Sequence, residues 1–370
     1  MKKMRVPFFP KDMFLEDKEI IYKTIYEAGI TNNFILKDNV KKLEEEAKKY
    51  TGAKDAIAVH SGTGAVSLSL RAIGVGPGDE VITQGYCCQP VASEVDNLGA
   101  TPIFVDIDPD TLVMDPSKIK KRITSKTKVI LPAHLFSCLV DMPEINKIAK
   151  EYGLKVIEDA CVQQGALLNG KAAGLLGDLG TWSFFQMKVM GGCGEGGMIL
   201  TNDEELAYKC RLIRNHGQES RFNHKYIGVN SRMDEIMAGY LLHRFENLDR
   251  ILKRRLEIAT YYNKRFSEIE DKIKLPPKNP QGRCYYMYTI RSKDRNSLQE
   301  FLLNKGIATH VYYPKILPEQ KAFINFRSSK DDLKECIKIS QESISIPIYP
   351  NLTDQQAKIV ADTIIEFYKS

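Results

Sequence analysis

The 370-residue sequence predicts an α/β protein, in which a large domain with a mainly parallel seven-stranded sheet precedes a smaller α+β domain. Three observations support this prediction: a series of short apolar runs rich in β-branched residues, helical patterns between these runs, and a change of pattern near residue 250. Near-continuous apolar runs are typical of parallel strands that helices cover on both faces. The length also suggests about two domains, at ~150 residues each.

The strands of the large domain are expected where apolar runs alternate with segments of helical periodicity. These runs are AIAVH (56–60), EVIT (80–83), TPIFVDI (101–107), KVILPAHL (128–135), KVIEDA (155–160), TWSFF (181–185) and GMILT (197–201). Between the first two, SGTGAVSLSLRAIG (61–74) has apolar residues at helical spacing and ends on Gly74, a plausible helix stop. The first strand therefore leads directly into a helix N-terminus.

The pattern changes after a long amphipathic stretch at 233–265, which predicts one long helix or a bent pair that links two domains. Beyond it lie apolar segments and helical patterns that suit a smaller α+β domain, at 285–290, 297–305, 308–314, 343–350 and 353–368. We therefore predict a large domain with an N-terminal arm at 1–250 and a small C-terminal domain at 251–370.

The composition excludes several classes of protein. With 43% hydrophobic and 27% charged residues the chain resembles ordinary globular proteins, and its net charge of +6 comes from interleaved rather than massed charges, so nucleic-acid binding is not expected. No apolar run approaches a membrane span, and MKKMRVPFFPKDMF lacks the apolar core of a secretory signal. Eight scattered cysteines without a CxxC pair or histidine cluster predict reduced thiols, a cytoplasmic location and no metal site.

The turn SGTG (61–64) is a candidate anion site. It lies at a predicted helix N-terminus, where free backbone N–H groups and the helix dipole attract a phosphate and glycine allows a close approach. An ordinary β–α turn with a serine or threonine cap would have the same sequence.

Asp159 ends the apolar strand KVIED, and ligands of open α/β sheets bind outside the carboxyl ends of the strands. A carboxylate there could hold a pyridine nitrogen protonated and so make the ring an electron sink. A helix cap is the alternative interpretation of an aspartate before Ala160 and Cys161.

Lys188 follows a predicted strand and precedes a glycine-rich loop in SFFQMKVMGGCGEGG (183–197). A lysine in a desolvated pocket has a depressed pKa and can form a Schiff base. A single lysine is usually a surface residue, but the phosphate turn, the strand-end aspartate and this lysine occur in the order that pyridoxal phosphate chemistry requires.

The same residues belong to motifs that extend over nearly the whole chain and resemble the DegT/StrS sugar aminotransferases, pyridoxal phosphate enzymes of the aspartate aminotransferase-like fold type I. The motifs are ILKDNVKKLEEEAKKYTGAKDAIAVHSGTGAV, GVGPGDEVI, LGATPIFVDID, VIEDA, SFFQMK, GEGGMILTND, RNHGQ, NSRMDEI and SIPIYPNLTD.

This resemblance implies a role for individual residues. Lys188 would be the Schiff-base lysine and the general acid and base, and Asp159 would pair with the pyridine nitrogen. The other cofactor contacts would come from Gly62, Thr63, Cys88, Gln163, Ser183 and Asn230. The expected substrate contacts are Tyr86, His134, Arg221 and Tyr312. Because Asn230 resembles the asparagine that reaches the phosphate of a neighbouring subunit, the resemblance also implies a homodimer with shared active sites.

Three positions depart from the family pattern. Cys88 stands where most members have an aromatic residue that stacks on the pyridine ring. Val162 stands where a glutamine or histidine usually contacts the ring hydroxyl, although Gln163 follows it, and Tyr312 replaces a common histidine. Lys188 and Asp159 are retained.

The resemblance implies a ping-pong transamination that moves an amino group from glutamate to a nucleotide-linked keto-sugar, in surface-polysaccharide or secondary-metabolite biosynthesis. One alternative keeps the fold but aminates a carbocyclic ketone or dehydrates its substrate. The dehydratase branch of the family has histidine in place of the lysine, so Lys188 argues against that reaction. Another alternative is a non-catalytic regulatory homologue, against which the retention of both Lys188 and Asp159 argues.

Overall fold

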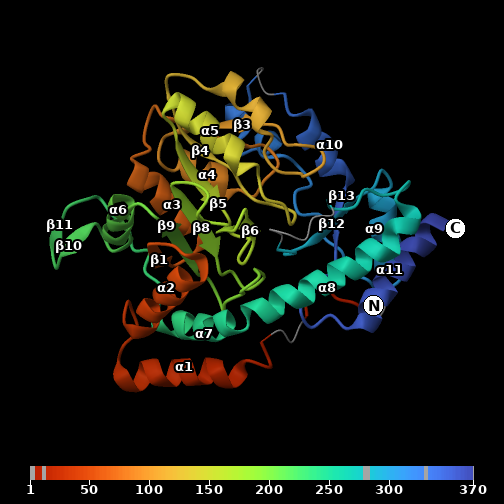
Figure 1. Ribbon diagram of the computed structural model, residues 1–370, viewed down its shortest axis with the longest axis horizontal. Coiled ribbons are helices and arrows are strands. Elements are labelled where there is room, and N and C mark those ends of the chain that lie inside the picture. The colour runs from red at the N-terminus through yellow and green to blue at the C-terminus, as the bar shows by residue number, and fades with distance from the viewer. Residues whose placement is uncertain (1–4, 11–13, 278–283, 329–331, 370) are drawn as a thin grey trace.

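The computed structural model describes residues 5–10, 14–277, 284–328 and 332–369. Its centre is a seven-stranded sheet of order β1-β9-β8-β5-β4-β2-β3, with helices packed around it (Figure 1). The strands are β1 (Asp55–Val59), β2 (Glu80–Gln84), β3 (Thr101–Val105), β4 (Thr127–Leu131), β5 (Lys155–Asp159), β8 (Leu179–Ser183) and β9 (Gly197–Thr201). Since β9 alone runs antiparallel to its two neighbours, the sheet is mainly parallel, and the predicted fold class is confirmed.

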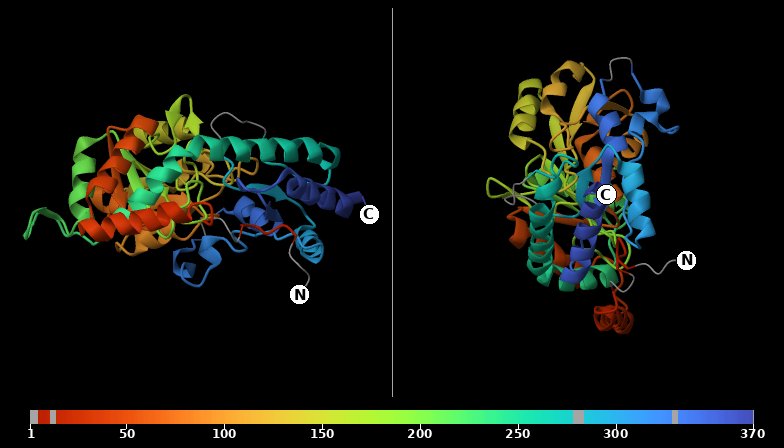
Figure 2. Two further views of the ribbon diagram at one scale, coloured as in Figure 1. Left: turned by 90° about the horizontal axis from the view of Figure 1, so that it is seen from below. Right: turned by 90° about the vertical axis from the view of Figure 1, so that its right-hand side faces the viewer.

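Helices of the first part of the chain surround this sheet. They are α1 (Lys18–Thr31), α2 (Asp38–Thr51), α3 (Gly62–Ile73), α4 (Pro90–Asp96), α5 (Met142–Tyr152), α6 (Glu204–Arg214) and α7 (Glu235–Glu246). Helix α1 packs on α7, and α3 packs on β8 and β9. Two small hairpins add β6 (Leu167–Leu168) with β7 (Lys171–Ala172), and β10 (Gln218–Ser220) with β11 (Asn223–His224). The β10–β11 hairpin projects from the body at its far edge (Figures 1 and 2).

Helix α3 has a defined start and stop, as the segment 61–74 predicted. The Ser61 hydroxyl accepts a hydrogen bond from the Gly64 amide at 3.0 Å, and Gly74 ends the helix with a φ of 86°, which glycine adopts readily. The stripe of Ala65, Val66, Leu68 and Leu70 is buried against the sheet. The N-terminus of α3 is thereby fixed beside the carboxyl ends of the strands.

The segment 233–265 forms a bent pair of helices rather than one helix. Helix α7 ends at Glu246, and the side-chain amide of the next residue, Asn247, donates to the His243 carbonyl at 3.0 Å. Helix α8 (Leu248–Phe266) then continues toward the C-terminal part of the chain (Figure 2). There β12 (Tyr288–Arg291) pairs with β13 (Ser343–Ile346), beside α9 (Arg295–Asn304), α10 (Lys334–Glu342) and α11 (Asp354–Lys369). The apolar segment 308–314 makes an isolated bridge at His310.

Buried apolar side chains form two clusters. One fills the space around the large sheet, and the other joins α8, β12, β13 and α11 with Val6 from the N-terminal segment. The first cluster also takes in Tyr286, Ile316 and Cys336 from beyond residue 250. The domain boundary near 250 therefore stays a prediction.

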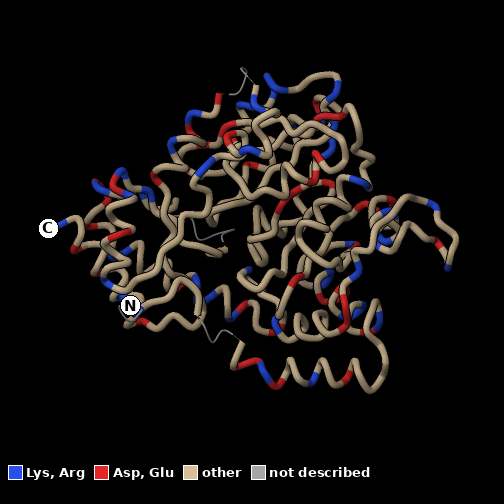
Figure 3. Tube along the Cα trace, turned by 180° about the vertical axis from the view of Figure 1, so that it is seen from behind, with Lys and Arg blue, Asp and Glu red and all other residues tan. Residues whose placement is uncertain are grey.

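Charged residues and cysteines are spread over the whole molecule. Lys and Arg are interleaved with Asp and Glu along the chain (Figure 3), and all eight cysteines are free thiols. Within the described ranges no helix is long and apolar enough to cross a membrane, and no group of His, Cys, Asp and Glu is arranged to hold a metal ion.

Candidate functional site

A cavity of ≈ 230 Å³ lies where the N-terminus of α3 meets the carboxyl ends of β5 and β8. Three predicted features, the SGTG turn, Asp159 and Lys188, contribute to its walls. The full lining is Gly62, Thr63, Val66, Cys88, Pro90, Asp159, Cys161, Ser183, Phe185, Lys188 and Glu195. The topology thus brings together residues from four separate segments of the chain.

The α3 end of the cavity is a cradle for an anion. The Ser61 hydroxyl accepts a hydrogen bond from the Gly64 amide. The amides of Gly62 and Thr63 come before the first intrahelical donor, Ala65, and remain available to a ligand. A Cβ atom on Gly62 would lie 2.6 Å from the Ser183 Cβ, so this approach of α3 to β8 requires glycine.

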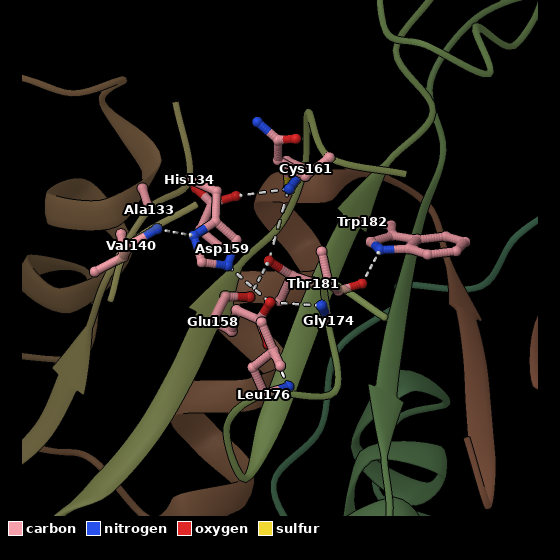
Figure 4. Close-up of polar contacts among 12 residues, drawn as sticks. Ala133, His134, Val140, Glu158, Asp159, Cys161, Gly174, Leu176, Thr181 and Trp182 are labelled. Atoms are coloured by element: carbon pink, nitrogen blue, oxygen red, sulfur yellow. Dashed lines mark hydrogen bonds and ion pairs between the residues drawn. The ribbon is translucent and has the colours of Figure 1, made fainter. Parts of the chain in front are cut away.

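Asp159 is a buried carboxylate that faces the cavity. It is 5% exposed, and its Oδ1 accepts the amide of Cys161 at 3.0 Å (Figure 4), while the Cys88 thiol lies 4.0 Å from its Oδ2. No cation of the described residues lies within ion-pair distance of this carboxylate. Because a buried charge is costly without a partner, the position suits a ligand that brings a protonated nitrogen.

Lys188 carries its ammonium group over the ring of Tyr286, with 5.2 Å from Nζ to the ring centroid. Burial alone would lower the pKa of Lys188, but Tyr286, Cys161, Cys88 and Asp159 act in the opposite direction, and the net effect raises it. The expectation of a depressed pKa was therefore wrong for this structure, because the surroundings favour the ammonium form more than burial opposes it.

Behind Asp159, on the opposite face of β5, Glu158 and His134 form a closed network (Figure 4). The Val140 amide donates to His134 Nδ1 at 3.0 Å, so Nε2 carries the proton and donates to Glu158 Oε1 at 2.8 Å. The amides of Gly174 and Leu176 donate to the same carboxylate at 2.6 and 2.7 Å. Both side chains are fully buried, and every donor has an acceptor.

Six residues expected at the site do not line the cavity, and three of them have their polar atoms engaged inside the protein. His134 is used by the network just described, and the Tyr86 ring stacks on Phe136 at 5.3 Å while its hydroxyl bonds Ser343 at 2.6 Å. The Gln163 amide is fully buried and bonds backbone groups of Cys138 and Cys284 instead. The polar atoms of Tyr86, His134 and Gln163 have partners inside the protein, which gives no support to their expected contacts with substrate or cofactor, and these contacts stay predictions.

The remaining expected residues divide between the neighbourhood of Lys188 and the outer surface. The Tyr312 ring is half-buried and lies 6.3 Å from that of Tyr286. Asn230 and Arg221 are exposed and lie outside the cavity of their own chain, Arg221 on the turn of the projecting β10–β11 hairpin (Figure 1).

The sequence analysis missed several residues that belong to the site. Cys161 lies two residues after Asp159 and Glu195 lies in the glycine-rich loop, so both follow motifs that had been recognised. Burial raises the pKa of the Cys161 thiol well above its usual range. Tyr286 had no such signal, because it comes from a segment almost a hundred residues beyond Lys188.

Comparison with known proteins supports the chemistry that the cavity suggests. Residues 16–365 match the DegT/DnrJ/EryC1/StrS aminotransferase family. A "Pleiotropic regulatory protein" of Geobacillus stearothermophilus is 42% identical, with 99% of each chain covered. The "UDP-2-acetamido-2-deoxy-3-oxo-D-glucuronate aminotransferase" of Pseudomonas aeruginosa is 36% identical, with 94% of this chain and 97% of that protein covered.

A solved structure agrees with the fold described above. The crystal structure of NtdA from Bacillus subtilis, with bound cofactor PMP, superposes with a TM-score of 0.93 at 34% identity. The superposition covers all of this chain and 86% of that one.

Proposed function

The chain belongs to the DegT/DnrJ/EryC1/StrS aminotransferase family, and we propose that it uses pyridoxal 5'-phosphate to transfer an amino group from glutamate to a keto-sugar. One observation carries the proposal: a single cavity joins a helix N-terminus, an unpaired buried carboxylate and a lysine without a carboxylate partner among the described residues. These are the groups that a phosphate, a pyridine nitrogen and a carbonyl carbon require.

The residues of the cavity fit the cofactor. The amides of Gly62 and Thr63 and the Ser183 hydroxyl would hold its phosphate, and Asp159 would pair with its pyridine nitrogen. When bound, the cofactor ring would serve as the electron sink for negative charge at the substrate carbon.

The chain's own residues would position the substrate and move the proton. Lys188 Nζ would take the proton from one carbon and return it to another, as a general base and then a general acid. The Tyr286 ring would hold the lysine side chain in the cavity, because an aromatic face attracts an ammonium group. Tyr312, next to Tyr286, would contact the substrate and keep water from this side of Lys188.

The acceptor is best assigned as a nucleotide-linked keto-sugar, since the Pseudomonas relative is named for a UDP-sugar substrate. Such products serve surface-polysaccharide or secondary-metabolite biosynthesis. A carbocyclic ketone is the alternative acceptor. The free cysteines support a cytoplasmic location for the enzyme.

A regulatory role is the second candidate function, because the relative that is 42% identical is named a regulatory protein. Incubation of the cofactor-loaded protein with glutamate separates the two candidates. An aminotransferase releases 2-oxoglutarate in the amount of bound cofactor, and the visible absorbance of the cofactor changes with it. A loaded protein that leaves both signals unchanged would contradict the proposed transamination. If the protein is active, a screen of keto-sugars would identify its acceptor.

We also propose that the protein is a homodimer with shared active sites. The hairpin carries Phe222 at 79% exposed, Ile227 nearby is 90% exposed, and Asn230 lies outside the cavity of its own chain. Large exposed apolar side chains on a projecting segment are typical of a surface that a partner covers.

A mixture of variants tests the shared site. Lys188→Ala and Asn230→Ala proteins should each lose activity alone. After re-association the mixture should recover up to about a quarter of wild-type activity, because half of the dimers are hybrids with one intact site. Asn202→Ala, on the opposite end of β9 from the cavity, is the matched control: it leaves Lys188 and Asn230 in place and should keep wild-type activity on its own. A fully active monomer would contradict the shared site.

A further inference from the structure

Lys188 also lies in the wall of a second, smaller cavity of ≈ 40 Å³. Helix α8 and the junction with α7 form one side of it, and the N-terminal segment with Phe9, Glu16 and Asp17 forms the other. Of the described residues, only Lys188 contributes to both this cavity and the one that contains Asp159. A ligand group in the second cavity would therefore lie next to the reactive lysine.

Arg255 from α8 lines the second cavity and is only 4% exposed. Its Nη1 donates to the backbone carbonyls of Tyr285, Tyr286 and Ile348 at 3.1, 2.9 and 2.9 Å. Its Nε is buried and has no hydrogen-bond partner. Within the part of the chain that the structure describes, no carboxylate lies within ion-pair distance of this guanidinium.

The preceding residue, Arg254, is an arginine of the same helix that has both carbonyl and carboxylate partners. Arg254 donates through Nη2 to the Leu352 carbonyl at 2.6 Å and to the Asp354 carboxylate at 2.7 Å, at the protein surface. Arg255 is far more deeply buried, yet it has carbonyl partners and no anion. A buried charge without a counter-charge is costly, so an anionic ligand would stabilise Arg255 by supplying the counter-charge that the described residues lack.

The charges around the cavity favour the same ligand. Arg244 and Arg250 stand beside Arg255 in its lining. The Asp17 carboxylate is already occupied by the Tyr240 hydroxyl at 2.6 Å and by Arg244 at 3.3 Å. Glu16 is exposed, and no ion pair joins it to a described residue.

We propose that this cavity is the subsite for the carboxylate of the amino-acid donor, with Arg255 as its main ligand. The inference rests on the proposed aminotransferase function and adds a residue that recognises the donor. The cavity has room for a carboxylate group beside Arg255, because a space of ≈ 40 Å³ exceeds the ~10–15 Å³ that one water requires. A guanidinium matches a carboxylate in geometry, and the shared Lys188 places the donor next to the reaction.

Glutarate tests the subsite, because it has the two carboxylates of glutamate but no amino group to transfer. Calorimetric titration of the cofactor-loaded protein should show glutarate binding, and glutarate should compete with glutamate. 1,5-Pentanediol, its uncharged analogue, should not bind. The Arg255→Lys variant, which keeps the charge but loses the planar fork, should bind glutarate about tenfold or more weakly and raise the KM for glutamate without a matching fall in kcat.

Two further variants separate recognition from folding. Arg254→Lys changes the neighbouring arginine in the same way and should leave glutarate binding and KM unchanged. Glu16→Gln changes an exposed side chain and should tighten glutarate binding a few-fold, because it removes a negative charge from the rim of the cavity. Unchanged glutarate binding in both Arg255→Lys and Glu16→Gln overturns the subsite.

The outcomes also distinguish this subsite from the proposed function. If Arg255→Lys turns over glutamate with the wild-type KM, the subsite is wrong and the transamination stands. If inorganic phosphate, and not glutarate, binds through Arg255 and competes with a nucleotide-sugar, the cavity serves the acceptor and the donor assignment is wrong. If the loaded wild-type protein never converts glutamate, the proposed function itself fails, whatever glutarate does.

Discussion

Glu158 and Asp159 are neighbours in the sequence, yet they lie on opposite faces of β5 in opposite electrostatic situations. The Glu158 carboxylate receives His134 Nε2 and the amides of Gly174 and Leu176, and all of these groups are buried (Figure 4). The Asp159 carboxylate receives one amide, faces a cavity and has no cation of the described residues beside it.

The difference indicates which buried acid has a structural role and which awaits a ligand. A carboxylate whose lone pairs are all taken by the protein stabilises the fold and cannot bind anything else. One that is buried but incomplete keeps its capacity to bind, at a cost that the rest of the structure offsets. The neighbours Arg254 and Arg255 on α8 show the same contrast with the opposite charge.

The largest effect is expected from Lys188→Ala, which removes the reactive amine from the cavity that Asp159 faces. Transamination should fall by about 10⁴-fold or more, since the variant loses both the Schiff-base amine and the general acid and base. Borohydride reduction of the wild-type protein should attach the cofactor to the peptide that contains Lys188, and peptide mapping by mass spectrometry would detect it.

The control for this experiment is Lys171→Ala, an exposed lysine of the β6–β7 hairpin, which should keep full activity and the same labelled peptide. The assignment of Lys188 fails if the reduced cofactor is found on any other lysine.

The comparison itself is tested by matched amide substitutions of the two acids. Asp159→Asn should lower kcat by about 10²-fold or more while the free energy of unfolding changes little, because the ring nitrogen would lose its counter-charge. Glu158→Gln should do the opposite: it should cost about 2–3 kcal/mol of stability, because three buried donors lose a charged acceptor, and should affect kcat much less. Thermal or denaturant unfolding and steady-state kinetics of both variants give the two quantities.

The contrast between the two faces would be lost if both variants unfolded equally easily, or if Glu158→Gln reduced kcat as much as Asp159→Asn. In either case the network behind β5 would be part of the catalytic machinery rather than its support.

A smaller effect is expected from the aromatic cover of Lys188. Tyr286 is the largest of the contributions that raise the pKa of the lysine, so Tyr286→Leu should lower that pKa and bring more free amine at neutral pH. Acetic anhydride modifies Lys188 in the cofactor-free protein at a rate that mass spectrometry can follow as a function of pH. The midpoint of this pH profile should lie at a lower pH in the variant than in the wild-type protein. Tyr286→Phe keeps the ring face and should lie between the two; an unchanged or upward shift in Tyr286→Leu would contradict the role of the ring.

The sequence predicted the elements that are local and left open the contacts between distant segments. The seven strands, α3 and the positions of Asp159 and Lys188 followed from apolar runs, a cap and a glycine-rich loop, each contained in a few residues. The sequence could not show that His134 has partners inside the protein, because Glu158 and the Val140 amide are brought to it by the folding of β5 and the loop after β4.

The smallest expected effect concerns Cys88, which departs from the family pattern and lines the same cavity as Asp159. Cys88 lines the cavity, whereas the Cys87 side chain is 2% exposed in the core. Cys88→Phe should therefore fit, and stacking on the cofactor ring should strengthen its binding by about 0.5–1.5 kcal/mol, or two- to tenfold in Kd. The same substitution at Cys87 overfills the core and should cost ~1–3 kcal/mol of stability. Titration of each variant with pyridoxal 5'-phosphate, combined with thermal unfolding, measures both effects. If Cys88→Phe weakens cofactor binding at unchanged stability, another residue covers the ring, and the space beside Cys88 belongs to the substrate.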